Sequence, residues 1–537
     1  MGPVYELPAQ FQRLCKKRGK RPRGKPADGP PPLNTSAGMA VRSAPLSPLE
    51  ASHLLRRTGF GCDVALWSSY VGMLPADAAG RMVDEALTQQ PPDPPSWATS
   101  YPPWGGTDEE KQEYINKQFP WFRELVTTWI KTMSKGGLRE KLTLFWHDHF
   151  ATERDNYFFS ILALDYLTLL RTHALGNFRE FVVRVGINPA MLIYLDGRLS
   201  TRQEPNENYA RELLELFTMG QYDHAGQPNY TEKDIVELSR CLTGYQVDYA
   251  DFSAHLVWGR TDHGEKELFG QKGRFNFGGA HEVIFQERKR QIAEFMAAKL
   301  YTEFVYVTPH PDVVTHLADI FESSDFEIAP VVRALLSSEH FYAVDTSGAK
   351  IKSPVEFYVG LLADTAGDAP DNAALRRLWR EMGSAAQRLL NPPNVAGWPG
   401  YRSWVSSSML LARWEGVDYI LPNAFQFKVD LVALARSLVD AADPLAVFKV
   451  PTALAAYLLA VPLDTLALDA PAEFSGDLQS YPIPDEIANG PQHVRDLAKI
   501  FLAGQPWYEW SLERQGIAWG ISKYVQFLAH LPEYQLA

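Results

Sequence analysis

The sequence predicts a mainly α-helical protein: a multi-helix globular body with a small β-hairpin or irregular excursion near residues 255–280. Apolar residues recur at helical spacing through most of residues 115–245 and again from Gln291. Signals that start helices occur at Ser47 and Thr231. Of the 537 residues, 46% are apolar and 12% aromatic, which is enough to bury a large core.

The chain divides into three predicted regions. Residues 1–45 are rich in lysine, arginine and proline, so we expect a disordered, basic N-terminus that buries little apolar area. Residues 46–420 are expected to form the helical body that carries the candidate site. Its first helix starts at Ser47, which is followed by proline and an acidic first turn. Residues 421–537 should form a C-terminal helical region packed on the same body.

Charge and hydropathy limit the partners. The net charge of −12 argues against nucleic acid as a partner. No apolar run reaches the roughly 18 residues of a transmembrane helix. The basic N-terminus is followed by no apolar segment with a cleavage site, so no signal peptide is visible and the sequence alone predicts a cytoplasmic protein. Its three cysteines share no CxxC spacing, which excludes a cysteine-based zinc site.

Residues 204–217 form the most informative segment. At helical spacing Asn208, Arg211, Glu212 and Glu215 share one face, while leucine and phenylalanine cover much of the rest. We therefore expect Glu212, Glu215 and Arg211 to be catalytic and Asn208 to bind substrate. The same charges would also suit an ion-pair network that fixes helix register.

The helix predicted after Thr231 repeats this pattern. It interleaves Asp234 and Glu237 with Arg240, and helix hairpins place such faces against one another. Arg240 is therefore a second candidate for substrate binding, with the structural ion-pair network as the alternative.

A second candidate cluster is the FWHDHF sequence of residues 145–150, which contains His147 and His149. Two residues on a regular helix point roughly 200° apart, so both rings reach one metal only if the helix ends there. His149 follows the apolar positions and should face the core. We expect His149 to take part in catalysis, and His147, His149 and Glu212 to be the ligands of a divalent metal such as zinc, iron or manganese. The alternatives are a structural buried histidine and a metal-free acid–base pair.

Residues 391–404 form a proline-rich loop with several aromatic side chains. Trp398 and Tyr401 offer flat apolar faces beside amide and guanidinium donors, which suits a pocket for a carbohydrate or another small ring-bearing ligand. Packing of the loop onto the helical body explains the same residues equally well.

Taken together, five segments resemble DUF1800, a large bacterial family of unknown function. They are residues 54–61 (LLRRTGFG), 145–150 (FWHDHF), 206–217 (NENYARELLELF), 352–356 (KSPVE) and 392–400 (PPNVAGWPG). The resemblance runs in order over nearly all of the expected ordered chain. It implies no settled activity, and because members of the family often look exported, it weakly implies work in the envelope or outside the cell.

One segment departs from the family pattern. Where the family resembles His-Asp-x-Gly-x-Lys, residues 261–266 read TDHGEK, so the histidine is shifted or lost. Asp262 and Lys266 are retained, and we expect Lys266 to contact substrate. A metal scheme that needs a histidine at this position does not fit the sequence.

Three functions remain open at this stage. The first is an enzyme with a carboxylate/arginine/histidine pocket between two helices, metal-assisted or not, that acts as a hydrolase or lyase on a carbohydrate or ester. The second is a magnesium-dependent enzyme like class I terpene synthases, because Glu204, Asn208, Arg211 and Glu212 partly resemble a magnesium-diphosphate motif. The third is a non-catalytic binding or scaffold protein.

Overall fold

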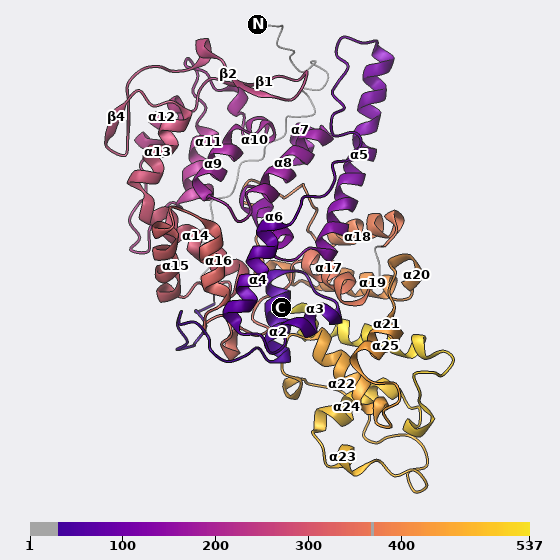
Figure 1. The fold of residues 1–537 in the computed structure, drawn as a ribbon. Coiled ribbons are helices and arrows are strands. Elements are labelled where there is room, and N and C mark those ends of the chain that lie inside the picture. Colours follow the sequence, from indigo (N-terminus) through magenta and orange to yellow (C-terminus); the bar gives the residue numbers. More distant parts are fainter. Residues whose placement is uncertain (1–29, 367–369) are drawn as a thin grey trace.

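Helices carry most of the regular structure, as predicted (Figure 1). The computed structural model describes residues 30–366 and 370–537. The first helices are α2 (Pro48–Thr58), α3 (Val64–Tyr70), α4 (Pro75–Thr88), α5 (Asp108–Lys135), α6 (Leu138–His149), α7 (Arg154–Tyr157), α8 (Ser160–Thr172), α9 (Phe178–Ile187) and α10 (Pro189–Tyr194). The middle helices are α11 (Glu207–Glu212), α12 (Glu232–Cys241), α13 (Phe277–Glu287), α14 (Lys289–Phe304), α15 (Pro311–Ser323), α16 (Ile328–Leu336), α17 (Pro354–Thr365) and α18 (Asn372–Ser384). The last are α19 (Ser407–Ile420), α20 (Ala424–Phe427), α21 (Leu431–Leu438), α22 (Ala446–Leu458), α23 (Asp485–Ala488), α24 (Gln492–Leu502) and α25 (Ile517–His530).

The predicted helix starts are confirmed. Ser47 accepts a hydrogen bond from the Glu50 N–H, and the Glu50 carboxylate accepts one from the Ser47 N–H in return. Thr231 and Asp234 form the same reciprocal cap at α12. These caps satisfy backbone donors that a helix N-terminus otherwise leaves without partners.

The β structure within the described ranges is small, as predicted for the middle of the chain. Strands β1 (Tyr245–Val247) and β2 (Ala254–Leu256) pair antiparallel, and so do β3 (Lys266–Leu268) and β4 (Gln271–Gly273). The excursion therefore begins before residue 255 and is over by Phe277, where α13 starts.

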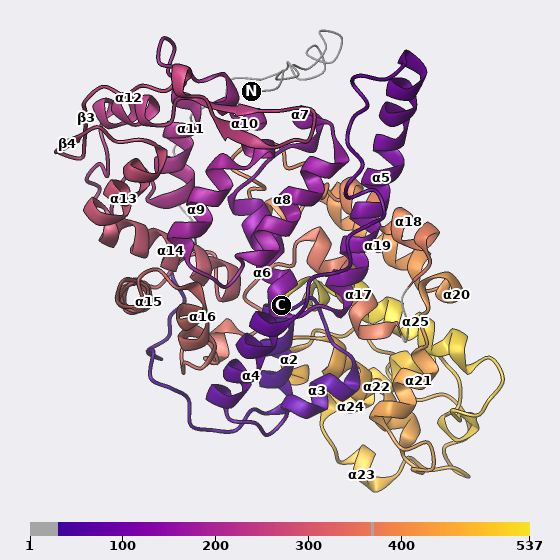
Figure 2. The ribbon, with the colours of Figure 1, turned by 45° about the horizontal axis from the view of Figure 1, so that its top comes forward.

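One hydrophobic core extends from Leu46 to Tyr534 and includes side chains from both sides of residue 420. A second, smaller cluster surrounds Phe448 and Phe474 in the C-terminal part. In Figures 1 and 2, α6 lies near the middle of the ribbon, with α14 and α16 on one side and α17 on the other. The helices from α21 onward gather at one end of the molecule.

The N-terminal segment is described only from residue 30. Residues 30–45 contain no helix, but they lie against the body: Val41 forms a β-bridge with Ser338, and Arg42 pairs with Glu50 and Glu339. The rest of the segment predicted to be disordered, residues 1–29, lies outside the described residues.

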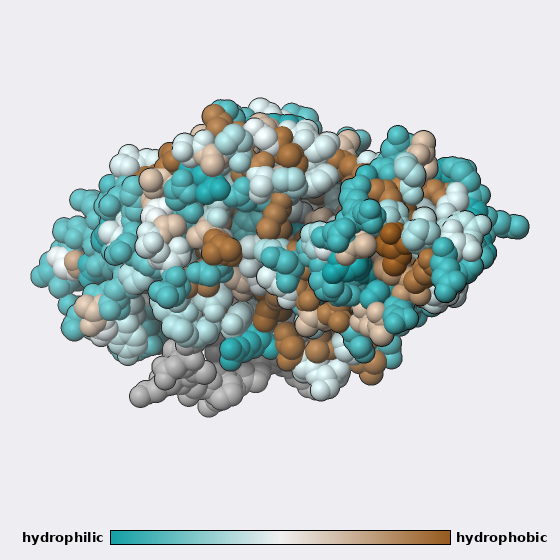
Figure 3. Space-filling view, turned by 90° about the horizontal axis from the view of Figure 1, so that it is seen from below, coloured by the Kyte–Doolittle hydropathy of each residue, from teal (hydrophilic) through white to brown (hydrophobic). Residues whose placement is uncertain are grey.

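On the face drawn in Figure 3, hydrophilic residues cover most of the area and hydrophobic residues form separate patches. Of the helices in the described ranges, none combines the length and apolarity that crossing a bilayer requires.

Candidate functional site

A cavity of about 260 Å³ lies where four segments distant in sequence meet. They are the end of α6, the second half of α14, residues 350–356 and the loop 391–404. Its polar lining consists of Asp148, His149, Lys299, Thr302, Glu303, Lys350, Ser353, Glu356 and Gln387, and its aromatic lining of Phe145, Trp398, Tyr401 and Trp404. Charged groups beside aromatic faces in one concave space form the arrangement expected of a small-ligand site.

The end of α6 sends three consecutive side chains in different directions. His147 Nε2 accepts a hydrogen bond from the Leu390 N–H at 2.9 Å, while His149 Nε2 donates to the Phe217 carbonyl at 3.0 Å. Burial lowers the pKa of His147 to about 4 and that of His149 to about 3, so both rings are neutral near pH 7. Of the two, only His149 lines the cavity.

Asp148, between the two histidines, is a cavity residue that the sequence reading missed. Its Oδ1 accepts a hydrogen bond from the Trp398 N–H at 2.6 Å. Burial raises the pKa of this carboxyl to about 7, although the Trp398 N–H and Lys299 act in the opposite direction. The side chain can therefore hold or release a proton near neutral pH, as a general acid or base must. Its sequence position gave one signal: Asp148 follows Leu144 and Phe145, which also line the cavity, by one helical turn.

Lys299 projects into the cavity from α14. Its side chain is reached by solvent from the cavity, yet protein surrounds it closely enough that desolvation lowers its pKa, against the opposing charge of Asp148. The Nζ atom lies 5.5 Å from the centre of the Phe295 ring. Among the described residues, no carboxylate forms an ion pair with it.

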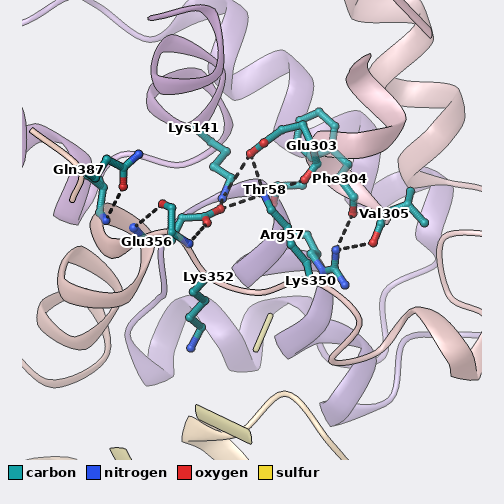
Figure 4. A network of polar contacts seen from close by, with 12 residues as sticks. Arg57, Thr58, Lys141, Glu303, Phe304, Val305, Lys350, Lys352, Glu356 and Gln387 are labelled. Carbon is teal, nitrogen blue, oxygen red and sulfur yellow. Dashed lines mark hydrogen bonds and ion pairs between the residues drawn. The ribbon is translucent and has the colours of Figure 1, made fainter. Parts of the chain in front are cut away.

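Two lysines and two glutamates form a largely buried network (Figure 4). Lys350 Nζ lies 2.9 Å from both Glu303 and Glu356, and Lys141 contacts Glu356 directly and Glu303 at 3.6 Å. Burial disfavours the charge on Glu356, but Lys141 and Lys350 outweigh it and hold the pKa of Glu356 well below its usual range. Lys352, also drawn in Figure 4, points away and donates to the Tyr534 carbonyl.

Local structure fixes Glu356 within this network. Its other carboxylate oxygen accepts the Ser353 N–H at 2.6 Å, completing the capping box at the start of α17. The motif at residues 352–356 thus both starts α17 and places Ser353 and Glu356 in the cavity lining.

The loop 391–404 forms a further wall of the cavity. Trp398 and Trp404 are each 6% exposed, and Tyr401 is partly buried; all three line the cavity. The structure therefore brings Trp398 and Tyr401, predicted as ligand contacts, together with His149.

The remaining predicted residues do not line this cavity. Arg211 pairs with Glu232 at 2.9 Å and with Glu207 at 3.5 Å, and Asn208 is exposed. Glu215 accepts a bond from the Tyr230 hydroxyl at 3.5 Å. Glu212, Glu215 and Arg211 therefore do not line the cavity that His149 lines, contrary to the prediction.

For Glu215 the physical reason lies in the helix itself. After Glu212 the chain continues as a π-helix (Leu213–Thr218), in which the Thr218 hydroxyl donates to the Leu213 carbonyl at 2.6 Å. A π turn holds more residues than an α turn, so the alignment assumed for a regular helix does not extend to Glu215. Leu216 instead reaches the cavity wall.

Arg240 and Lys266 belong to a separate polar cluster. Arg240 pairs with Glu237 and Asp262, each at 2.8 Å, and Lys266 donates to the carbonyls of Asp262 and Phe275. These bonds tie α12 to the β3–β4 hairpin.

The predicted metal ligands do not form one donor set. His147 and His149 use their Nε2 atoms for backbone hydrogen bonds on different segments. Within residues 30–366 and 370–537, no group of three or more His, Cys, Asp or Glu side chains is arranged to hold a metal ion. His147, His149 and Glu212 therefore do not fit as a common site.

Comparison with known families covers nearly the whole chain. The family model described as "Protein of unknown function (DUF1800)" matches residues 53–536. The chain belongs to the DUF1800 family. All four cavity segments of this DUF1800 chain fall inside the matched range. No curated protein and no solved structure matches it.

Residues 261–266, where this DUF1800 chain differs from the family pattern, lead into the β3–β4 hairpin. His263 stacks on Trp258 with ring centres 3.8 Å apart and remains exposed, while Asp262 faces Arg240 and Lys266. The shifted histidine of this DUF1800 member is thus an outer residue of the hairpin region.

Proposed function

We propose that the protein is an enzyme that uses the cavity around Asp148 for acid–base chemistry, as a hydrolase or lyase acting on a carbohydrate or ester. The observation that carries the proposal is the position of Asp148: a carboxyl in the wall of a 260 Å³ cavity, held by the Trp398 N–H and facing charged and aromatic side chains. A group that exchanges its proton near neutral pH suits general acid catalysis.

Two carboxylates in different environments support this chemistry. Desolvation raises the pKa of Asp148 to about 7, whereas Glu303 forms an ion pair with Lys350 at 2.9 Å. Pairs of titratable groups whose environments differ in this way commonly divide acid and base roles. In the proposed reaction Asp148 donates a proton to the leaving oxygen as its bond to carbon breaks. Glu303 takes a proton from the attacking water in hydrolysis, or from the neighbouring carbon in an elimination that forms a C=C bond.

His149 and the aromatic residues complete the proposed site. Burial keeps the His149 ring neutral near pH 7, and the ring forms part of the cavity wall. Trp398, Tyr401 and Trp404 give the cavity an apolar wall, and the partly buried Tyr401 is the more accessible of the three rings for a sugar ring. The cavity is slightly smaller than the roughly 300–1,000 Å³ usual for ligand pockets, which favours a small molecule.

Turnover by the purified protein tests the proposal. Aryl glycosides, aryl esters and uronic-acid polysaccharides serve as probes for hydrolysis and elimination. We expect Asp148→Asn to lower turnover of an accepted probe by about 10²-fold or more. Asp93→Asn, an exposed carboxylate outside the cavity, is the matched control. Unchanged turnover in Asp148→Asn would contradict the proposal.

The other two functions stay predictions. The terpene synthase-like alternative predicts magnesium-dependent turnover of a prenyl diphosphate that is lost in Glu212→Gln. The scaffold alternative predicts a folded protein in which Asp148→Asn changes neither binding nor turnover of any probe. A metal cofactor and a cytoplasmic location are likewise predictions, tested by metal analysis and by fractionation of the cells that produce the protein.

A further inference from the structure

The charged side chains of the cavity are equal in number but not all paired by contact. Its lining contains Lys299 and Lys350 with Lys141 directly behind them, opposite Asp148, Glu303 and Glu356. Two of the lysines are already engaged, because Lys141 and Lys350 share the carboxylates of Glu303 and Glu356. That leaves Lys299 and Asp148 as the groups whose charges are not balanced by contact.

Lys299 is the one cavity lysine of the described chain that has no ion-pair partner. Asp148 influences it electrostatically but lies outside the 4.0 Å limit of an ion pair, and its carboxylate is already bound by the Trp398 N–H. When Asp148 holds its proton, one positive charge in the cavity lacks a counter-charge. A cation that lines a cavity and has no ion-pair partner favours an anionic group on a ligand.

The walls beside Lys299 suit a sugar ring. Trp398, Tyr401 and Trp404 supply apolar lining, and the polar residues Thr302 and Ser353 also line the space. Sugar rings combine apolar faces with hydroxyl groups that need hydrogen-bond partners, so both kinds of lining have a use.

We propose that the cavity selects a sugar ring bearing a carboxylate, and that Lys299 is the residue that binds the carboxylate. This inference rests on the proposed function for its cavity and narrows its substrate class to uronic acids. Lys299 acts as a specificity residue: it is needed for anionic sugars, and a neutral sugar does not depend on it. In an elimination reaction, the same ion pair would also make the hydrogen beside the carboxylate easier to remove.

Binding measurements separate this inference from the proposed catalysis. Calorimetric titration at about pH 6, where Asp148 is largely protonated, compares D-glucuronate, D-glucose and acetate as ligands. We expect glucuronate to bind about tenfold or more tightly than glucose, and acetate to bind weakly because it lacks the ring.

Variants on the same helix identify the responsible cation. Lys299→Met should remove the preference for glucuronate while leaving glucose binding unchanged, and Lys299→Arg should retain it. Lys289→Met changes an exposed lysine of α14 outside the cavity and serves as the control. Thermal unfolding checks that each variant folds.

Each outcome bears on the inference. Equal binding of glucose and glucuronate, an unchanged preference in Lys299→Met, or acetate binding as tightly as glucuronate would overturn it while leaving the proposed catalysis intact. Failure of all three ligands to bind would overturn the inference, whereas the proposed catalysis is decided by the turnover of aryl esters and the other probes. Selective binding that depends on Lys299, without any turnover, would support the inference and contradict the proposed catalysis.

Discussion

The Trp398 N–H donates a 2.6 Å hydrogen bond to the Asp148 carboxylate across 250 positions of sequence. This bond joins the end of α6 to the loop 391–404, so the candidate acid and the aromatic wall of the cavity are positioned together. The preceding residue, Gly397, has a φ of +75°, and a Cβ there would collide with the Asp148 carboxylate and carbonyl. Glycine thus permits the close approach on which the contact depends.

Gly397→Ala should therefore damage both stability and the site. The positive φ and the collision together are expected to lower the free energy of unfolding by about 2–4 kcal/mol, measured by urea denaturation. Gly72→Ala is the matched control, because Gly72 has a φ of +82° but open space around its Cβ position. Equal losses in the two variants would show that contact with Asp148 contributes nothing.

Glu356→Gln tests the buried network. The change leaves Lys141 buried without its closest counter-charge, and we expect a loss of about 3–5 kcal/mol in the free energy of unfolding. Glu339→Gln, in a partly exposed pair with Arg42, should cost only about 0–1 kcal/mol.

The pH dependence of the Glu356 contribution has a defined sign. Because the folded pKa of Glu356 is depressed, its stabilisation is present above its ordinary pKa of 4.5 and is lost as the pH falls toward the folded pKa. The difference between the wild-type protein and Glu356→Gln should therefore shrink in acid. A difference that grows as the pH falls would contradict the assignment.

Asp148 should behave in the opposite way. Its folded pKa of about 7 lies above its usual value of 3.8, so its ionisation costs stability. The penalty is absent below the usual value, grows as the pH rises between the two values, and is complete above the folded pKa. Asp148→Asn removes the charge but keeps an oxygen for the Trp398 N–H. At about pH 8 the variant should be about 1–3 kcal/mol more stable than the wild-type protein, and at about pH 4 nearly equal to it.

Chemical denaturation at both pH values checks this prediction. A variant that is less stable than the wild-type protein at the higher pH would mean that the carboxylate is well satisfied in its ionised form.

Arg211→Ala tests whether the predicted α11 face matters for function. Its pairs with Glu232 and Glu207 are partly exposed, so the free energy of unfolding should fall by no more than about 1 kcal/mol. Turnover of any accepted probe should remain. Loss of turnover in a stably folded Arg211→Ala protein would show that the α11 face takes part in the activity.

The sequence predicted the fold better than the site. Helix periodicity and the caps at Ser47 and Thr231 are local signals, and the structure confirms the mainly α-helical fold they indicated. The aromatic loop was also recognisable, because prolines and tryptophans crowd into residues 391–404, and two of its predicted residues reach the cavity.

The rest of the site depends on long-range packing. Asp148 was passed over because its histidine neighbours carried the more familiar metal-binding signal. Lys299 and Glu303 lie on α14, where single charges usually face solvent, and only the tertiary arrangement that places α14, the end of α6 and the loop 391–404 around one cavity marks them as site residues. The π-helix after Glu212 has no simple sequence signature, so the alignment of Glu215 with Arg211 could not be checked from sequence alone.

The protonation of Asp148 is the claim on which the proposed function most directly depends. Carbon-13 NMR of protein labelled at aspartate side-chain carboxyls measures it without a known substrate, and the signal missing from Asp148→Asn gives the assignment. We predict a titration midpoint near the value of about 7 that burial imposes. A midpoint at about 4, as in unperturbed aspartate, would contradict a proton-donating role for this residue.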